Sequence, residues 1–190
     1  MIKFLKLVLL GLTIASVNLQ RANAQSPASE YEVKAAFLYN FIKFVEWPPK
    51  AFPEKQFPYV IGVLGKEDPF SNPVSLTNYL DEAIIGKKIN ERPLVIVRRS
   101  RIADLKECHL IFISKSERSR LKDILGALRD RNVLTVSETE DFCQQGGVVN
   151  FIKQSGKVRF EINPSAAEAA GLKISSKLLN VAKIVATEPR

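Results

Sequence analysis

Four short apolar runs, separated by longer amphipathic segments, constrain the fold of this chain more than any other feature of its sequence. The runs cover residues 59–64, 93–98, 109–114 and 133–136, and Val, Ile and Leu dominate them. Runs that are apolar at nearly every position are typical of strands buried on both faces, as in parallel sheets. Their alternation with helical segments therefore predicts an α/β sandwich with a mainly parallel sheet.

Helical periodicity is clearest at residues 30–45, where Val33, Phe37 and Phe41 recur at four-residue intervals. The apolar arc of this segment is wide, so we expect the helix to be covered on two sides. Pro48, which directly follows Trp47, ends the helical pattern.

Residues 148–152 and 157–162 are two β-like runs on either side of Ser155-Gly156, a spacing that predicts an antiparallel hairpin. Further helices are expected at residues 74–83, 164–170 and 174–185. Another helix should follow Ser116, which can cap it, with Glu117 in its first turn. The predicted fold is thus one domain over residues 25–190. Its mainly parallel sheet is extended by a C-terminal antiparallel hairpin, with helices on both faces.

The first 24 residues have the three zones of a secretory signal peptide. Lys3 and Lys6 precede the apolar residues 7–17, and Ala22-Asn23-Ala24 is a small-x-small cleavage pattern. We predict cleavage after Ala24 and a periplasmic mature protein. The alternative is a retained membrane anchor, but the uncharged stretch is shorter than the roughly 18 residues that a spanning helix needs.

The charge of the chain bears on its partners. Loss of Lys3, Lys6 and Arg21 with the signal peptide lowers the net charge from +8 to +5. An exported protein rarely meets nucleic acid, so we predict no nucleic-acid partner. Weak attraction to an anionic surface such as peptidoglycan and a merely solvated basic surface both remain open.

The sequence contains few candidate catalytic residues. His109 is the single histidine, no Gly-x-Ser-x-Gly elbow supplies a nucleophile, and no phosphate-binding glycine motif is present. Cys108-His109 with the distant Cys143 does not have the local spacing of a zinc site. We therefore predict a protein that is not an enzyme and has no cofactor and no metal.

Two groups of residues allow alternative interpretations. One group is aromatic: Phe37, Phe41, Phe44 and Trp47. These side chains either pack only in the core, or pack in the core and also form part of a surface that contacts a partner protein. The two cysteines form one disulfide, or remain two buried thiols that pack as small apolar groups. The disulfide would need residues 139–145 to fold back as a short helix that returns Cys143 to the sheet edge near Cys108.

The chain resembles the YfiR family of bacterial periplasmic proteins. Agreement is scattered in order over nearly the whole mature sequence, in residues 32–41 (EVKAAFLYNF), 44–48 (FVEWP), 62–65 (GVLG), 68–70 (DPF), 108–114 (CHLIFIS), 133–137 (VLTVS), 146–147 (GG), 158–163 (VRFEIN) and 171–179 (GLKISSKLL). This coverage is more specific than any single motif.

The resemblance implies a non-catalytic inhibitor that docks on the periplasmic sensor domain of a membrane-bound diguanylate cyclase, which lowers cyclic di-GMP and biofilm formation. It also implies a homodimer and control through disulfides. In the family pattern, the partners of Cys108 and Cys143 fall near Gly62 and Asn150, so neither family disulfide can form in this chain. We expect partner contacts on Phe37, Phe41, Phe44 and Trp47 and in the region from Phe151 to Phe160.

The alternative function is a periplasmic sensor of a small ligand or a cell-wall fragment. Open α/β sheets bind ligands at the carboxyl ends of their parallel strands. Polar residues follow the predicted strands there: Lys66, Asp68, Arg99, Lys115, Ser137 and Glu138.

Overall fold

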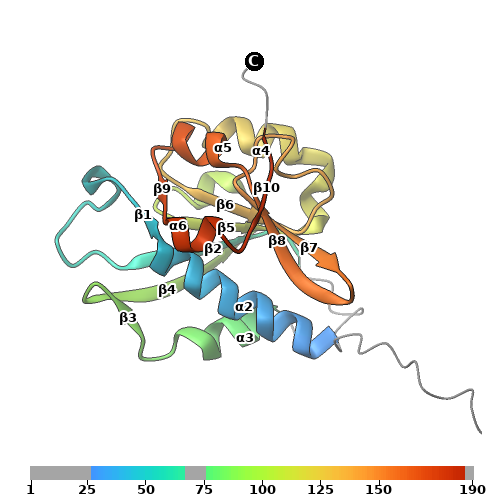
Figure 1. Ribbon diagram of the computed structural model, residues 1–190. Coiled ribbons are helices and arrows are strands. Elements are labelled where there is room, and N and C mark those ends of the chain that lie inside the picture. Colours follow the sequence, from blue (N-terminus) through green and yellow to red (C-terminus); the bar gives the residue numbers. More distant parts are fainter. Residues whose placement is uncertain (1–26, 67–75, 187–190) are drawn as a thin grey trace, which may run out of the picture.

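The fold is built on an eight-stranded mixed sheet (Figure 1). It was analysed in a computed structural model that describes residues 27–66 and 76–186. The strand order is β10-β8-β7-β6-β5-β2-β4-β3. The strands are β2 (Tyr59–Leu64), β3 (Lys88–Ile89), β4 (Arg92–Arg99), β5 (Leu110–Ile113), β6 (Leu134–Ser137), β7 (Val149–Gln154), β8 (Lys157–Ile162) and β10 (Lys183–Ile184).

The pairing in the sheet follows the sequence pattern. Strands β4, β2, β5, β6 and β7 run parallel to one another, and β8 pairs antiparallel to β7. The hairpin turns at Ser155 and Gly156, whose φ angles of 51° and 74° are the pair of positive values that a tight two-residue turn requires. The predicted parallel sheet with a C-terminal antiparallel hairpin is confirmed.

Helices cover both faces of the sheet, as predicted (Figure 1). The helices are α2 (Pro27–Phe44), α3 (Leu76–Ile84), α4 (Leu121–Leu128), α5 (Pro164–Ala169) and α6 (Ser176–Leu179), with 3-10 turns η1 (Pro49–Ala51), η2 (Ile102–Asp104) and η3 (Lys115–Arg120). Alternating residues of β2 divide the core between the faces. Ile61 and Val63 join α2 and α3 in one cluster, whereas Val60 and Leu64 join α4 in the other.

Two local predictions are wrong in detail. The hydroxyl oxygen of Ser114, not that of Ser116, accepts the capping hydrogen bond, from the Ser116 backbone N–H. The cap therefore lies two residues earlier than predicted, and the chain passes through η3 before α4 begins. Residues 139–145 form consecutive turns in place of the expected short helix, with Asp141 at a φ of 57°.

The last helix is also shorter than its sequence predicts. Residues 173–174 form β9 (Lys173–Ile174), which pairs antiparallel with β1 (Val45–Glu46). Only Ser176–Leu179 is helical, and the chain then extends as β10 and pairs parallel with β8. Strand pairing thus replaces the helical spacing of the apolar residues between Ile174 and Val185. Within the described ranges, no helix has the length and apolarity to cross a membrane. The predicted signal peptide lies outside them.

Candidate functional site

The aromatic side chains of α2 pack against the β7–β8 hairpin. Phe37 stacks on Phe41 with 6.0 Å between ring centroids, and Phe160 meets both rings edge to face at 5.1 Å. Phe151 lies 5.8 Å from Phe41. Each such pair contributes about 0.5–1.5 kcal/mol beyond burial alone. Phe41, Phe151 and Phe160 are buried in the core of this conformation, and the partner contacts expected on them stay a prediction.

Trp47 and His109 form a second aromatic cluster beneath η1. Trp47 is buried, and its indole Nε1–H donates to the backbone oxygen of His109 at 3.2 Å. The Val60 N–H donates to Nδ1 of His109 at 3.1 Å, and Nε2 lies 3.1 Å from the Ala51 carbonyl oxygen, which assigns the proton to Nε2. Burial lowers the pKa of His109 to about 4. Trp47 and His109 are thus held as core residues.

Cys108 and Cys143 are both buried free thiols. Cys108 lies against β2 at Gly62, whereas Sγ of Cys143 lies 3.6 Å from the Val148 oxygen and 3.8 Å from the Glu161 oxygen, beside β7 and β8. From β2 to β7 there are three strand steps, about 14 Å at normal spacing. Of the two alternatives, this structure has the two buried thiols and not the Cys108–Cys143 disulfide, because the sulfurs lie over different strands.

The surroundings of the two thiols include Gly62 and Asn150. A Cβ built on Gly62 would lie 2.8 Å from Sγ of Cys108. The Asn150 backbone interacts with the Cys143 thiol, although burial dominates and raises the pKa of Cys143 to about 12. Burial likewise raises the pKa of Cys108 to about 12. These raised pKa values favour the protonated thiol, which is the less nucleophilic form, at neutral pH.

An ion-pair network around the buried Lys34 lies at the carboxyl ends of β5 and β6. Nζ of Lys34 on α2 lies 2.6 Å from Glu30 and 2.5 Å from Glu138, and Lys153 lies 2.6 Å from Glu30. Burial alone would lower the pKa of Lys34, but Glu138 and Glu30 outweigh it and raise that pKa. Burial would raise the pKa of Glu30, yet Lys153 and Lys34 lower it overall. The network ties α2 to the sheet.

The same edge offers few free polar groups to a ligand. The Ser137 hydroxyl donates to the Ile113 oxygen, and the Ser114 hydroxyl donates to the Lys66 oxygen. Lys115 is 3.9 Å from Glu138, and the exposed Arg99 bonds the backbone of Arg98. Of the two remaining candidates, Lys66 is exposed, and Asp68 lies outside the described residues. Within the described residues, no group of three His, Cys, Asp or Glu side chains could hold a metal.

A partly apolar surface remains beside α2. Val181 and Ile184 are exposed, with relative residue exposures of 66% and 49%, and Phe37 and Phe44 are half-buried. Helix α2 contacts α6 and β8, and β10 pairs with β8, so these residues come from adjoining elements (Figure 1). We call Phe37, Phe44, Val181 and Ile184 the α2/C-terminal surface. The sequence did not indicate its C-terminal part, because residues 174–185 were expected to form one helix whereas only Ser176–Leu179 is helical.

Comparisons with known proteins were made for sequence and for fold. The sequence profile of the YfiR/HmsC-like family matches residues 31–183, and no curated protein matches the sequence. A conserved domain protein from Vibrio cholerae O1 biovar eltor shares 16% identity and a TM-score of 0.53, over 83% of this chain and 60% of that chain. The ABC domain in complex with L-Trp from Streptococcus pneumonia shares 10% identity and a TM-score of 0.54, over 80% of this chain and 60% of that chain. The chain thus spans about 60% of the length of these structures, which share its fold.

Proposed function

Because this chain belongs to the YfiR/HmsC-like family, we propose that it is a periplasmic, non-enzymatic regulator that binds and inhibits the sensor domain of an inner-membrane signalling protein. The proposed partner is a membrane-bound diguanylate cyclase, so that binding lowers cyclic di-GMP. The family match over residues 31–183 carries this proposal, because it spans almost all of the described domain.

The environment of His109 supports a role without catalysis. Both ring nitrogens face backbone groups, the side chain is 1% exposed, and four aromatic rings surround it. A general base needs access to a substrate proton. We therefore assign His109 a structural role and not a catalytic one.

We place the partner contact on the α2/C-terminal surface. Exposed apolar side chains beside half-buried aromatic rings are typical of protein-binding surfaces. Within the described residues, the other exposed large apolar side chains are Ile85 and Val95. They follow α3 and lie on β4, so they provide a matched control surface.

Affinity capture from inner membranes tests both levels of the proposal. Immobilised mature protein is expected to retain a membrane protein that carries a diguanylate cyclase domain. The variant Val181→Lys/Ile184→Lys should lose at least about tenfold of this capture, whereas Ile85→Lys/Val95→Lys, with the same added charge, should keep it. Equal capture by both variants would overturn the contact surface alone. Failure of the wild type to capture any inner-membrane signalling protein would overturn the function.

Export belongs to the same proposal. Cleavage after Ala24 would release a mature chain that starts at Gln25, directly before the described domain. Mass spectrometry of the periplasmic fraction should give the mass of residues 25–190, and a membrane-retained full-length chain would contradict it. The homodimer and the contact with peptidoglycan stay predictions from the sequence.

A further inference from the structure

A pocket of about 500 Å³ opens between α4, α5 and the turn at residues 144–148. Val133 and Thr135 at the start of β6, Val148 before β7 and Asn163 after β8 also line it. These positions lie at the amino ends of the parallel strands, the opposite edge from the Lys34 network. Its volume falls in the range of sites for small organic ligands, about 300–1,000 Å³.

Hydrogen bonds fix the walls of the pocket. The Val148 N–H donates to Oγ1 of Thr135 at 3.0 Å. Asn163 donates to the Cys143 oxygen at 2.9 Å and accepts from the Ala166 N–H at 3.0 Å. The pocket is therefore held open by the fold itself, which favours binding because little ordering is needed.

The lining combines an apolar part with a basic rim. The half-buried Leu125, Ala166 and Ala170 provide apolar contacts, and Gln144, Gln145 and Ser165 add neutral polar groups. The charged residues of the lining are Lys122 and Arg129, and no Asp or Glu takes part.

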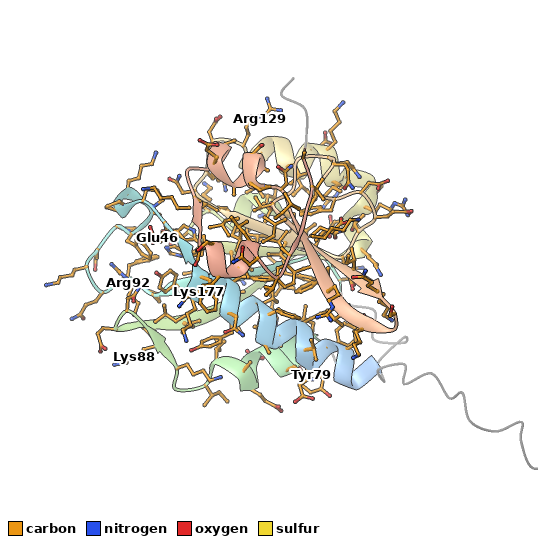
Figure 2. All side chains as sticks on the ribbon, in the orientation of Figure 1. Glu46, Tyr79, Lys88, Arg92, Arg129 and Lys177 are labelled. Atoms are coloured by element: carbon orange, nitrogen blue, oxygen red, sulfur yellow. The ribbon has the colours of Figure 1, made fainter. Side chains whose placement is uncertain are left out.

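Lys122 and Arg129 lie seven residues apart on and just after α4, and therefore on the same side of that helix. Figure 2 shows Arg129 at the surface by α4 and α5. In the described part of the chain, neither cation forms an ion pair.

We propose that this pocket binds a small organic anion whose apolar body lies against Leu125, Ala166 and Ala170 and whose acidic group lies between Lys122 and Arg129. Two cations can each donate charge-assisted hydrogen bonds to one carboxylate, sulfonate or phosphate, and the apolar walls add burial. The site is separate from the α2/C-terminal surface and does not depend on the proposed partner.

Gly126 offers a direct way to close the pocket. It lines the cavity, and a Cβ added there would meet no atom within 4 Å. Gly126→Phe would therefore occupy the open space without a clash at its first atom. The neighbouring Ala127 is exposed and does not line the pocket, so Ala127→Phe adds the same ring outside it.

Two fluorescent probes separate charge from apolar contact. 8-Anilinonaphthalene-1-sulfonate is an aromatic anion, and N-phenyl-1-naphthylamine is a similar neutral aromatic. Fluorescence titration of the mature protein is expected to give one site for the sulfonate. Gly126→Phe should weaken it at least about tenfold relative to Ala127→Phe, with folding checked by circular dichroism.

The charge requirement has its own pair of variants. Lys122→Gln/Arg129→Gln should weaken the sulfonate about tenfold and leave the neutral probe unchanged, whereas Lys50→Gln/Lys157→Gln, which removes two exposed cations elsewhere, should change neither. The proposal is overturned if the wild type does not bind the sulfonate, if Gly126→Phe binds it like Ala127→Phe, or if the two double variants behave alike.

Discussion

Replacing Gly62 by cysteine should create a disulfide with Cys108. A Cβ on Gly62 would lie 2.8 Å from Sγ of Cys108, and normal disulfide geometry needs about 3.0 Å between the Cβ of one cysteine and the sulfur of the other. The bond would close a loop of roughly 47 residues, for which the chain-entropy model gives about 4 kcal/mol of stabilisation. The reduced variant should be less stable than wild type by about 1–3 kcal/mol, because the added group overpacks the contact with Cys108, Leu105 and Ile111.

The assay combines thiol counting with urea unfolding. Gly62→Cys is refolded with oxidised and reduced glutathione, since burial raises the pKa of Cys108 to about 12 and slows exchange in the folded protein. Denatured without reductant, the variant should show one reactive thiol, from Cys143, and wild type should show two. Gly62→Cys/Cys108→Ala serves as the control that cannot form the bond.

The oxidised single variant should exceed its own reduced form by about 4 kcal/mol in unfolding free energy. Three reactive thiols after oxidative refolding would refute the placement of Cys108 beside Gly62.

Two further predictions concern buried charge. Burial lowers the pKa of His109 from 6.5 to about 4. The neutral imidazole therefore makes its full contribution to folding stability above pH 6.5, and this contribution is lost as the pH falls towards 4. Between pH 7 and pH 4, the free energy of unfolding in urea should fall by about 3 kcal/mol more for wild type than for His109→Gln. Equal falls for the two proteins would contradict the buried environment of His109. Lys34→Met should cost about 3 kcal/mol at pH 7 because Glu30 and Glu138 lose their buried partner. Loss of the exposed Arg118 side chain, which pairs with Glu140, should lower the unfolding free energy by less than about 1 kcal/mol. Equal losses for the Lys34 and Arg118 variants would contradict the stabilising role of the Lys34 network.

The sequence predicts the sheet well because its central strands are buried on both faces. The runs at β2, β5 and β6 are apolar at most positions, and all of their residues are buried. The hairpin is predictable because Ser155 and Gly156 supply local turn chemistry. In these segments the local pattern and the tertiary environment favour the same structure.

Predictions fail where distant segments decide the local structure. Residues 174–185 have helical spacing, yet pairing with β1 and β8 makes both ends of this segment extended. The Lys34–Glu138 pair and the pocket between α4 and α5 join residues far apart in the chain, and no local pattern marks them. The aromatic residues of α2 show that their number alone does not reveal which of them are covered, because the hairpin buries Phe41 while Phe37 and Phe44 stay half-buried.

Cellular cyclic di-GMP, measured in the host with and without this chain, tests the proposed function most directly. Deletion should raise cyclic di-GMP, and the exported wild type and Ile85→Lys/Val95→Lys should both restore the lower level. Val181→Lys/Ile184→Lys should fail to restore it although it is exported and folded. A cyclic di-GMP level that does not change on deletion would contradict the proposed regulation of a diguanylate cyclase.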